Sequence, residues 1–205
     1  MSGILFVISA PSGTGKTTVA RRVQQRVEGL DWSVSFTTRE PREGEVDGRE
    51  YRFVGPQEFS EMEAAGAFLE CADVFGHRYG TGLAQTREKL AQGRDLLLEI
   101  DVQGAAQIRN GPIEAVSVMI LPPDFATLEA RLTGRGSEAA DQRAGRLAKA
   151  RTEAEEYRHF NYMVVNADLE PAVEQVASIV RAERRRVERC GAAAQAILDD
   201  FPHPA

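Results

Sequence analysis

The chain has 205 residues, of which 42% are hydrophobic and 27% are charged, and this length and composition are typical of one folded α/β domain with its own core. Its formal net charge of −6 argues against a non-specific nucleic-acid binder, because such a protein needs a broad basic face. No apolar run is as long as a membrane span, and the first residues lack a basic segment followed by an apolar one. We therefore expect neither nucleic acid nor a membrane as a partner.

The cysteines and histidines form no pattern typical of a metal site or of a disulfide framework. Cys71 and Cys190 are far apart in the chain, and His77, His159 and His203 are scattered. The sequence therefore predicts two reduced thiols and a cytoplasmic location.

A phosphate-binding loop is predicted near the N-terminus. The apolar run at 4–8 predicts a strand, and the valine spacing within 17–27 predicts a helix. Between them, Gly13 and Gly15 let the backbone curl with its N–H groups toward phosphate oxygens, where side chains would obstruct them. Lys16 is expected to reach the β- and γ-phosphates of a nucleotide. The predicted ATP-binding residues of this loop are Ala10, Pro11, Ser12, Gly13, Thr14, Gly15, Lys16, Thr17 and Thr18.

The loop departs from the usual P-loop pattern at one position, and it does not by itself select a substrate. Ala10 stands where a glycine is usual, and alanine is tolerated if the backbone there avoids a glycine-only conformation. A glycine-rich turn that merely caps a helix is the alternative, but the preceding strand and the following Lys-Thr pair favour a P-loop. A nucleoside triphosphate is therefore the expected ligand, while ATPases, GTPases, kinases and motor proteins remain open.

Three near-continuous apolar runs predict further strands of a parallel sheet that is covered on both faces. They lie at 96–101, 116–121 and 163–166 and alternate with helix-like segments. One of these segments, 125–132, follows Asp124, which is a good N-cap residue.

Other segments have different patterns. Residues 35–82 hold short, polar-interrupted strands, including the end of a strand predicted at 32–38, and are expected to be an insertion beside the main sheet. A helix over 138–158 has few large apolar residues, so we expect it to be mobile, as a lid requires. In a further helix predicted over 171–194, we interpret the basic run at 184–186 as a solvated face with intrahelical ion pairs rather than as a nucleic-acid patch.

A longer motif selects among the P-loop classes. The stretch SVSFTTREPREGEVDGREY, from Ser33 to Tyr51, resembles the guanylate kinase signature V-S-x-T-T-R-x-P-R-x-G-E-x-x-G-x-x-Y. The resemblance covers roughly residues 3 to 185. Further matches follow in order at 68–70, 79–81, 99–104, 121–123, 131–136 and 165–168.

The resemblance implies the fold class and the domain organisation. The expected fold is α/β, a P-loop three-layer fold with a parallel central sheet, a small mixed α/β insertion that binds the nucleoside monophosphate (NMP), and a helical lid. One guanylate-kinase-like domain would span 1–205. Its core would comprise 1–34, 83–124 and 160–205, its GMP-binding insertion 35–82, and its lid 125–159.

The resemblance also implies a GMP site with two parts. Arginine and tyrosine donors would bind the α-phosphate through charge-assisted hydrogen bonds. Hydroxyls would bond guanine O6 and N7, and carboxylates would accept from N1–H and N2–H₂, because a carboxylate has only acceptors. The phosphate part comprises Arg39, Arg42, Tyr51 and Tyr79, and the base part comprises Ser35, Glu70, Thr81 and Glu99.

The residues taken alone leave alternatives to this GMP site. Glu70 and Glu99 lie in apolar runs and would otherwise be sheet-edge residues that face solvent. The arginines would otherwise be surface charges, and the tyrosines packing residues. Many family members have Asp at position 99, so whether the longer Glu99 contacts guanine directly or through water is left open.

The reaction implied by the resemblance is Mg²⁺-dependent transfer of the ATP γ-phosphoryl group to GMP or dGMP, giving ADP and GDP in purine nucleotide metabolism. Thr17 would bind the metal ion and Asp101 would act on it through water. Asn166 would belong to the adenine pocket. The implied catalytic residues are Lys16, Arg39, Arg131, Arg135 and Arg146.

Two other functions fit parts of the pattern. Guanylate-kinase-like modules of scaffold proteins bind partner peptides without catalysis, but their P-loop lysine is generally lost, whereas Lys16 is present here. A P-loop kinase for a bisphosphate sugar would have no use for the predicted guanine-binding side chains. The sequence leaves a monomer and a homo-oligomer equally open.

Overall fold

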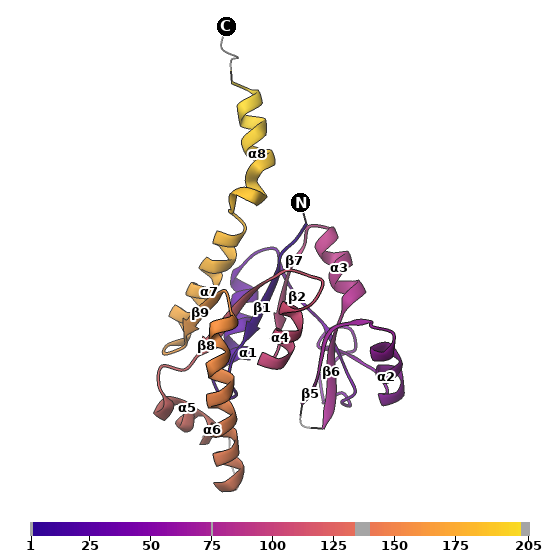
Figure 1. The fold of residues 1–205 in the computed structure, drawn as a ribbon, viewed down its shortest axis with the longest axis vertical. Helices are drawn as coiled ribbons and strands as arrows, with labels where there is room; N and C mark the ends of the chain where they lie inside the picture. The colour runs from indigo at the N-terminus through magenta and orange to yellow at the C-terminus, as the bar shows by residue number, and fades with distance from the viewer. Residues whose placement is uncertain (1, 75, 134–139, 202–205) are drawn as a thin grey trace.

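The computed structural model describes residues 2–74, 76–133 and 140–201, except for the side chains of residues 133 and 140–146. Within these residues the chain forms two β-sheets with helices around them (Figure 1). In this part of the chain, no helix combines the length and the apolar character needed to cross a membrane. The α/β class expected from the sequence is confirmed.

The larger sheet is parallel throughout. It consists of β1 (Leu5–Ser9), β2 (Leu30–Trp32), β7 (Asp95–Glu99), β8 (Ala115–Leu121) and β9 (Tyr162–Val165). Its strand order is β2-β7-β1-β8-β9, so β1 is the central strand and pairs with β7 and β8. Because the carboxyl ends of parallel strands share one edge, the loops after β1 and β7 lie next to each other.

Helices cover both faces of this sheet. Phe6 and Ile8 of β1 pack with α1 (Lys16–Arg26) and α7 (Leu169–Glu183), whereas Leu5 and Val7 pack with α3 (Leu83–Ala91) and α4 (Val102–Arg109). Alternate residues of a strand point to opposite faces, and a sheet buried on both faces needs apolar residues at all of them. The continuous apolar run of β1 thus produces the three layers that were expected.

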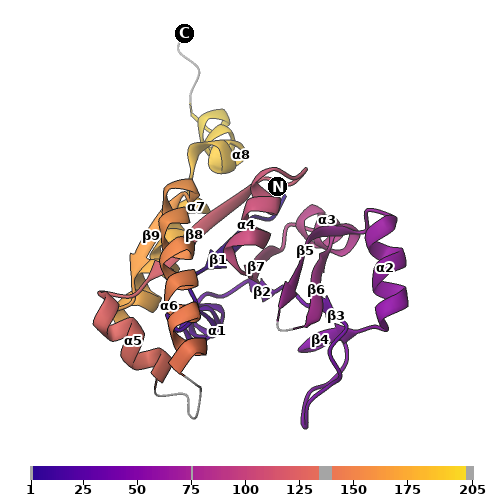
Figure 2. The ribbon, with the colours of Figure 1, turned by 60° about the horizontal axis from the view of Figure 1, so that its bottom comes forward.

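The smaller sheet is mixed and lies within residues 35–82. It contains β3 (Ser35–Thr37), β4 (Tyr51–Phe53), β5 (Phe68–Val74) and β6 (His77–Gly82) in the order β4-β3-β6-β5, where only β3 and β4 are parallel. One face is covered by α2 (Pro56–Ala64), whose buried Phe59 stacks on Phe68. Figure 2 shows this sheet and α2 as a separate lobe beside the central sheet.

The strand predicted at 32–38 is wrong, because this run contains two strands of different sheets. Trp32 ends β2, which pairs with β7, whereas Ser35 begins β3, which pairs with β4 and β6. Between them, the Ser33 N–H donates to the Leu97 carbonyl at 3.0 Å. A run of apolar and small residues does not reveal where the chain leaves one sheet for another.

Two helices follow β8 and form a third part of the molecule. In α5 (Phe125–Thr133), the Thr127 N–H donates to Asp124 Oδ1 at 2.7 Å, which confirms the predicted cap. The next helix, α6 (Ala140–Glu155), continues into the short 3₁₀ turn η1 (Glu156–His159). Ala150 of α6 packs with Leu128 and Leu132 of α5 in a small apolar cluster. The predicted helix start at 138 lies outside the described residues, and the predicted mobility stays a prediction.

The single helix predicted over 171–194 is also wrong, because the chain breaks after α7 and resumes as α8 (Val187–Asp199). Arg184, in the break, donates from Nε to Asp95 Oδ2 at 2.7 Å and ties the end of α7 to β7. Arg186 pairs with Glu183, but Arg186 precedes α8 and Glu183 ends α7, so this ion pair spans the break and is not the intrahelical pair that was expected. Helical periodicity does not predict the long-range ion pair between Arg184 and Asp95. Beyond the break, α8 projects from the body and buries none of its residues (Figure 1).

Candidate nucleotide-binding cleft

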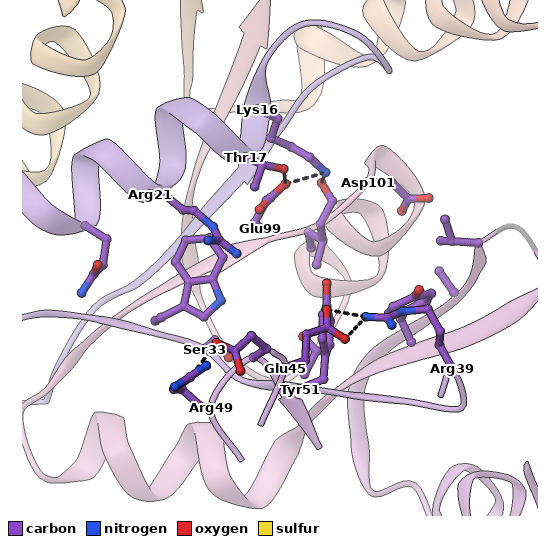
Figure 3. Close-up of a pocket in the computed structure, with 18 of the residues that line it drawn as sticks. Lys16, Thr17, Arg21, Ser33, Arg39, Glu45, Arg49, Tyr51, Glu99 and Asp101 are labelled. Atoms are coloured by element: carbon purple, nitrogen blue, oxygen red, sulfur yellow. Dashed lines mark hydrogen bonds and ion pairs between the residues drawn. The ribbon is translucent and has the colours of Figure 1, made fainter. Parts of the chain in front are cut away.

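A cleft of about 620 Å³ lies between the carboxyl edge of the central sheet and the smaller sheet. Figure 3 shows the P-loop side chains on one wall and the arginine and tyrosine side chains of the smaller sheet on the other. The carboxyl edge of a parallel α/β sheet is where such folds bind ligands. Of the predicted site residues, the cleft brings together Lys16, Thr17, Ser35, Arg39, Arg42, Tyr51, Glu70, Tyr79, Glu99 and Asp101.

The P-loop is held in shape by its neighbours. Gly13 and Gly15 have φ angles of 87° and 91°, a region that glycine adopts without strain. A Cβ at Gly13 would lie 2.6 Å from Leu132 Cδ2, so α5 packs directly on the loop. On the other side, Asn166 Nδ2 donates to the Thr14 carbonyl at 2.7 Å. Contacts from α5 and from Asn166 thus support the shape of the loop.

Lys16 and Thr17 open α1 and face a shared carboxylate. Lys16 Nζ donates to the Ile100 carbonyl at 2.7 Å and lies 3.8 Å from Glu99 Oε1. Burial lowers the pKa of the Lys16 ammonium, and nearby carboxylates, led by Glu99, partly raise it. Thr17 Oγ1 donates to the same Glu99 oxygen at 2.5 Å. Glu99 therefore lies against Lys16 and Thr17, and its role as a guanine acceptor stays a prediction.

Asp101 lies at the end of the same strand edge. It caps α4, because its Oδ1 accepts from the Gly104 N–H at 2.9 Å. With Thr17 and Glu99 it lines the part of the cleft next to Lys16. Among the described residues, no three or more acidic, histidine or cysteine side chains form a ready-made metal cage.

On the opposite wall, a carboxylate holds the predicted phosphate-binding residues. Arg39 Nη2 donates to both carboxylate oxygens of Glu45, at 2.8 and 2.9 Å, and the Arg42 N–H donates to Glu45 Oε2 at 2.8 Å. These bonds, with Arg39 first, lower the pKa of the Glu45 carboxyl. Sequence reasoning missed this residue, although its signal, the Gly44-Glu45 pair, lies inside the signature.

Two tyrosines stand beside Arg39. The rings of Tyr51 and Tyr79 pack edge to face with centroids 5.7 Å apart, and the Arg39 guanidinium lies 5.4 Å from the Tyr51 ring centre. Burial raises the pKa of the Tyr51 phenol, so its hydroxyl remains a donor at neutral pH. Packing and phosphate binding are therefore compatible roles for these rings.

Glu70 is a buried carboxyl group at the base of the cleft. It is 5% exposed, so it is not the solvent-facing sheet-edge residue of the alternative interpretation. Thr81 Oγ1 donates to Glu70 Oε1 at 2.6 Å. A Cβ at Gly104 would lie 2.7 Å from Glu70 Oε2, so the absence of a side chain there leaves room for the carboxyl group. Burial raises the pKa of Glu70 to about 7, against the opposing effect of the Thr81 hydrogen bond.

This pKa predicts a pH-dependent stability. Between pH 4.5, the ordinary pKa of this group, and about pH 7, folding is coupled to the uptake of a proton by Glu70. The stability that the protonated form contributes is therefore complete below pH 4.5 and is lost as the pH rises through about 7. The Glu70→Gln variant stays neutral throughout. Relative to that variant, the native protein should lose up to about 3 kcal/mol of unfolding free energy between pH 5 and pH 8.5. Urea unfolding at both pH values, with the exposed Glu58→Gln as control, measures this difference. If the unfolding free energies of the native protein and of Glu70→Gln differed by the same amount at both pH values, the prediction would be wrong.

The remaining predicted residues lie away from the cleft or outside the described part. Arg131 Nη1 donates to the carbonyls of Asn166 at 3.0 Å and Thr14 at 3.4 Å, so this side chain ties the P-loop to the loop after β9. Its catalytic role stays a prediction. Arg135 lies outside the described residues, as does the side chain of Arg146 in α6.

A glycine-rich loop with Lys-Thr at the carboxyl edge of a five-stranded parallel sheet, facing a second lobe across a cleft, defines a P-loop protein with the architecture of a nucleotide kinase. Comparison with known proteins identifies the family. The guanylate kinase family model matches residues 2–183. The chain therefore belongs to the guanylate kinase family.

Individual relatives agree with this assignment along nearly the whole chain. A guanylate kinase from Syntrophotalea carbinolica is 48% identical over 198 residues, which cover 97% of this chain and 94% of that protein. One from Neisseria meningitidis serogroup B is 51% identical over 187 residues, or 91% of each chain. The crystal structure of guanylate kinase from Anaplasma phagocytophilum matches with a TM-score of 0.73 at 30% identity and covers 99% of this chain and 97% of that one. These matches agree with the resemblance of the signature stretch.

Proposed function

We propose that the protein transfers the γ-phosphoryl group of ATP to the phosphate of GMP or dGMP and releases ADP and GDP. The observation that carries this proposal is the pairing of two anion-binding walls across one cleft. Lys16 and Thr17, which follow the P-loop glycines, lie on the donor wall, and Arg39 and Arg42 belong to the acceptor wall. An acceptor phosphate oxygen is already ionised, so the reaction needs alignment and charge neutralisation rather than a protein nucleophile.

The acceptor base would be selected by hydrogen bonding at the base of the cleft. Glu70 is buried and reaches the cleft with Thr81 bound to one of its oxygens. Guanine offers two donors, N1–H and N2–H₂, where adenine presents a bare acceptor at N1, so a carboxylate favours guanine. Ser35 lines the same cleft and would contribute a hydroxyl, and Glu99 would be the second carboxylate.

A magnesium ion fits the donor end of the cleft. The Thr17 hydroxyl and the carboxylates of Glu99 and Asp101 are oxygen donors, which Mg²⁺ prefers, and Mg²⁺ takes most of its remaining ligands from phosphates and water. Thr17 would bind the ion directly and Asp101 through water. When bound, the ion neutralises charge on the transferring phosphoryl group. Glu99 also contacts Lys16 and the Thr17 hydroxyl, so these side chains lie together at this end of the cleft.

We infer a separate role for each of the three parts of the fold. We assign GMP binding to residues 35–82, closure over the donor to residues 125–159, and the core to 1–34, 83–124 and 160–205. Closure would bring Arg135 and Arg146 to the reacting phosphates and would exclude water, which otherwise competes with GMP. We also propose a cytoplasmic location, since Cys71 and Cys190 are free thiols.

Product analysis tests the proposed reaction. Purified protein, MgATP and GMP should give ADP and GDP in equal amounts, as measured by chromatography. Binding of GMP without any GDP would indicate a binding module, and ADP with inorganic phosphate but no GDP would indicate an ATPase. Either result would overturn the proposal. A sugar phosphate that replaced GMP as the preferred acceptor would do the same.

A further inference from the structure

Glu153 of α6 is a buried carboxylate for which the proposed reaction has no use. It is 8% exposed, although ionised carboxylates are rarely so buried without a strong partner. Its Oε2 accepts a hydrogen bond from the backbone N–H of Ser12, in the P-loop, at 3.2 Å. Its Oε1 lies 3.6 Å from Lys149 Nζ, but the Lys149 side chain is mostly exposed, so this ion pair neutralises little of the charge.

The position of Glu153 follows from the packing of α5 and α6 on the P-loop. Ala150, one turn before Glu153, packs with Leu128 and Leu132 of α5. Leu132 in turn lies against Gly13. Because residues three apart share a helix face, the face of α6 that packs on α5 continues at Glu153 to the loop. The carboxylate is thus held at the P-loop by the fold.

The charge of Glu153 acts on the phosphate-binding side of the loop. The Lys16 ammonium, whose pKa is lowered by burial, feels an opposing, stabilising effect from Glu153, after those of Glu99 and Asp101. The ammonium of a P-loop lysine is the group that contacts nucleotide phosphates. A phosphate bound by Lys16 would therefore also experience the negative charge of Glu153.

We propose that Glu153 places a negative charge at the edge of the P-loop, and that this charge opposes the binding of a nucleotide in proportion to the phosphate charge of that nucleotide. Glu153 thereby weakens the binding of polyphosphates and favours release of the product ADP. It links the occupancy of the P-loop to the position of α6, because its side chain belongs to that helix. This inference rests on the proposed function, in which the P-loop binds ATP.

Nucleotide affinities of the Glu153→Gln variant test the proposal. Glutamine keeps the shape and an acceptor for the Ser12 N–H but removes the charge. Titration calorimetry with adenosine, ADP and ATP in EDTA varies the ligand charge without a metal ion. We expect the variant to bind ADP about 3-fold and ATP about 10-fold more tightly than the native protein, with adenosine unchanged. The matched control is Glu155→Gln, which removes an exposed charge two residues away on the same helix and should change none of the three affinities.

Each other outcome has a definite meaning. Equal or weaker binding of ADP and ATP by Glu153→Gln would overturn the proposal and would make Glu153 a support for the loop. An equal gain for all three ligands would also overturn it, because a general change in the pocket does not depend on charge. Native protein that binds no ATP and forms no GDP would refute the proposed function itself. Native turnover with no effect of Glu153→Gln would refute only this inference.

Discussion

The Lys16→Met variant should lose about 10³-fold or more in kcat while it remains folded. Lys16 is the cation at the start of α1 and lines the cleft, and its ammonium donates to the Ile100 carbonyl at the carboxyl end of β7. Removing one preorganised charge from a water-excluded site costs orders of magnitude, because nothing in the site reorganises to replace it. A 10³-fold loss corresponds to about 4 kcal/mol of transition-state stabilisation.

The fold should survive this change because burial already disfavours the Lys16 ammonium, as its lowered pKa indicates. The variant should keep a native circular dichroism spectrum and a melting temperature close to that of the native protein. Lys89→Met, on α3 and outside the cleft, is the control and should retain full activity. Steady-state kinetics with MgATP and GMP measure the loss. A near-native rate for Lys16→Met would contradict the assignment of Lys16 as the P-loop lysine.

The P-loop could be predicted in detail because it depends on local sequence. Gly13 and Gly15 have the positive φ angles that their residue type suggested, and Lys16 begins the helix that valine spacing predicted. The apolar run of β1 likewise indicated a sheet buried on both faces. In each case the signal and the structure involve neighbouring residues.

Most of the misses have a different cause, since they depend on residues far apart in the chain. Glu45 is the exception, because Arg39 is only six residues away and the bond depends on how the loop before β4 folds back. Glu153 reaches Ser12 across 141 positions of sequence. The end of α7 is tied to Asp95 by Arg184, which helical periodicity cannot reveal. The sequence pattern of one segment does not identify the residue of a distant segment with which it interacts.

Discrimination among acceptors should be the second large effect, with GMP favoured over AMP by about 10⁴-fold in kcat/KM. The physical reason is a mismatch of hydrogen-bond polarity at a buried group. Glu70 is 5% exposed, and above its pKa of about 7 it is a carboxylate with acceptors only, so at pH 8.5 adenine N1 would place a lone pair against it. IMP lacks N2–H₂ and should be poorer than GMP by roughly 10-fold or more, since one carboxylate acceptor is left without a donor. With no side chain assigned to the ribose 2′-OH, dGMP should remain a good acceptor.

The panel of GMP, dGMP, IMP, AMP, CMP and UMP with MgATP measures these ratios, and Glu70→Gln identifies their source. A neutral amide both donates and accepts, so this variant should raise the kcat/KM for AMP relative to GMP, whereas the exposed Glu58→Gln should leave the ratio unchanged. A smaller discrimination in Glu70→Gln with the ATP KM unchanged would locate the effect in the acceptor site. Equal rates with AMP and GMP in the native protein would refute the guanine site but not the P-loop fold, because the two depend on different walls of the cleft.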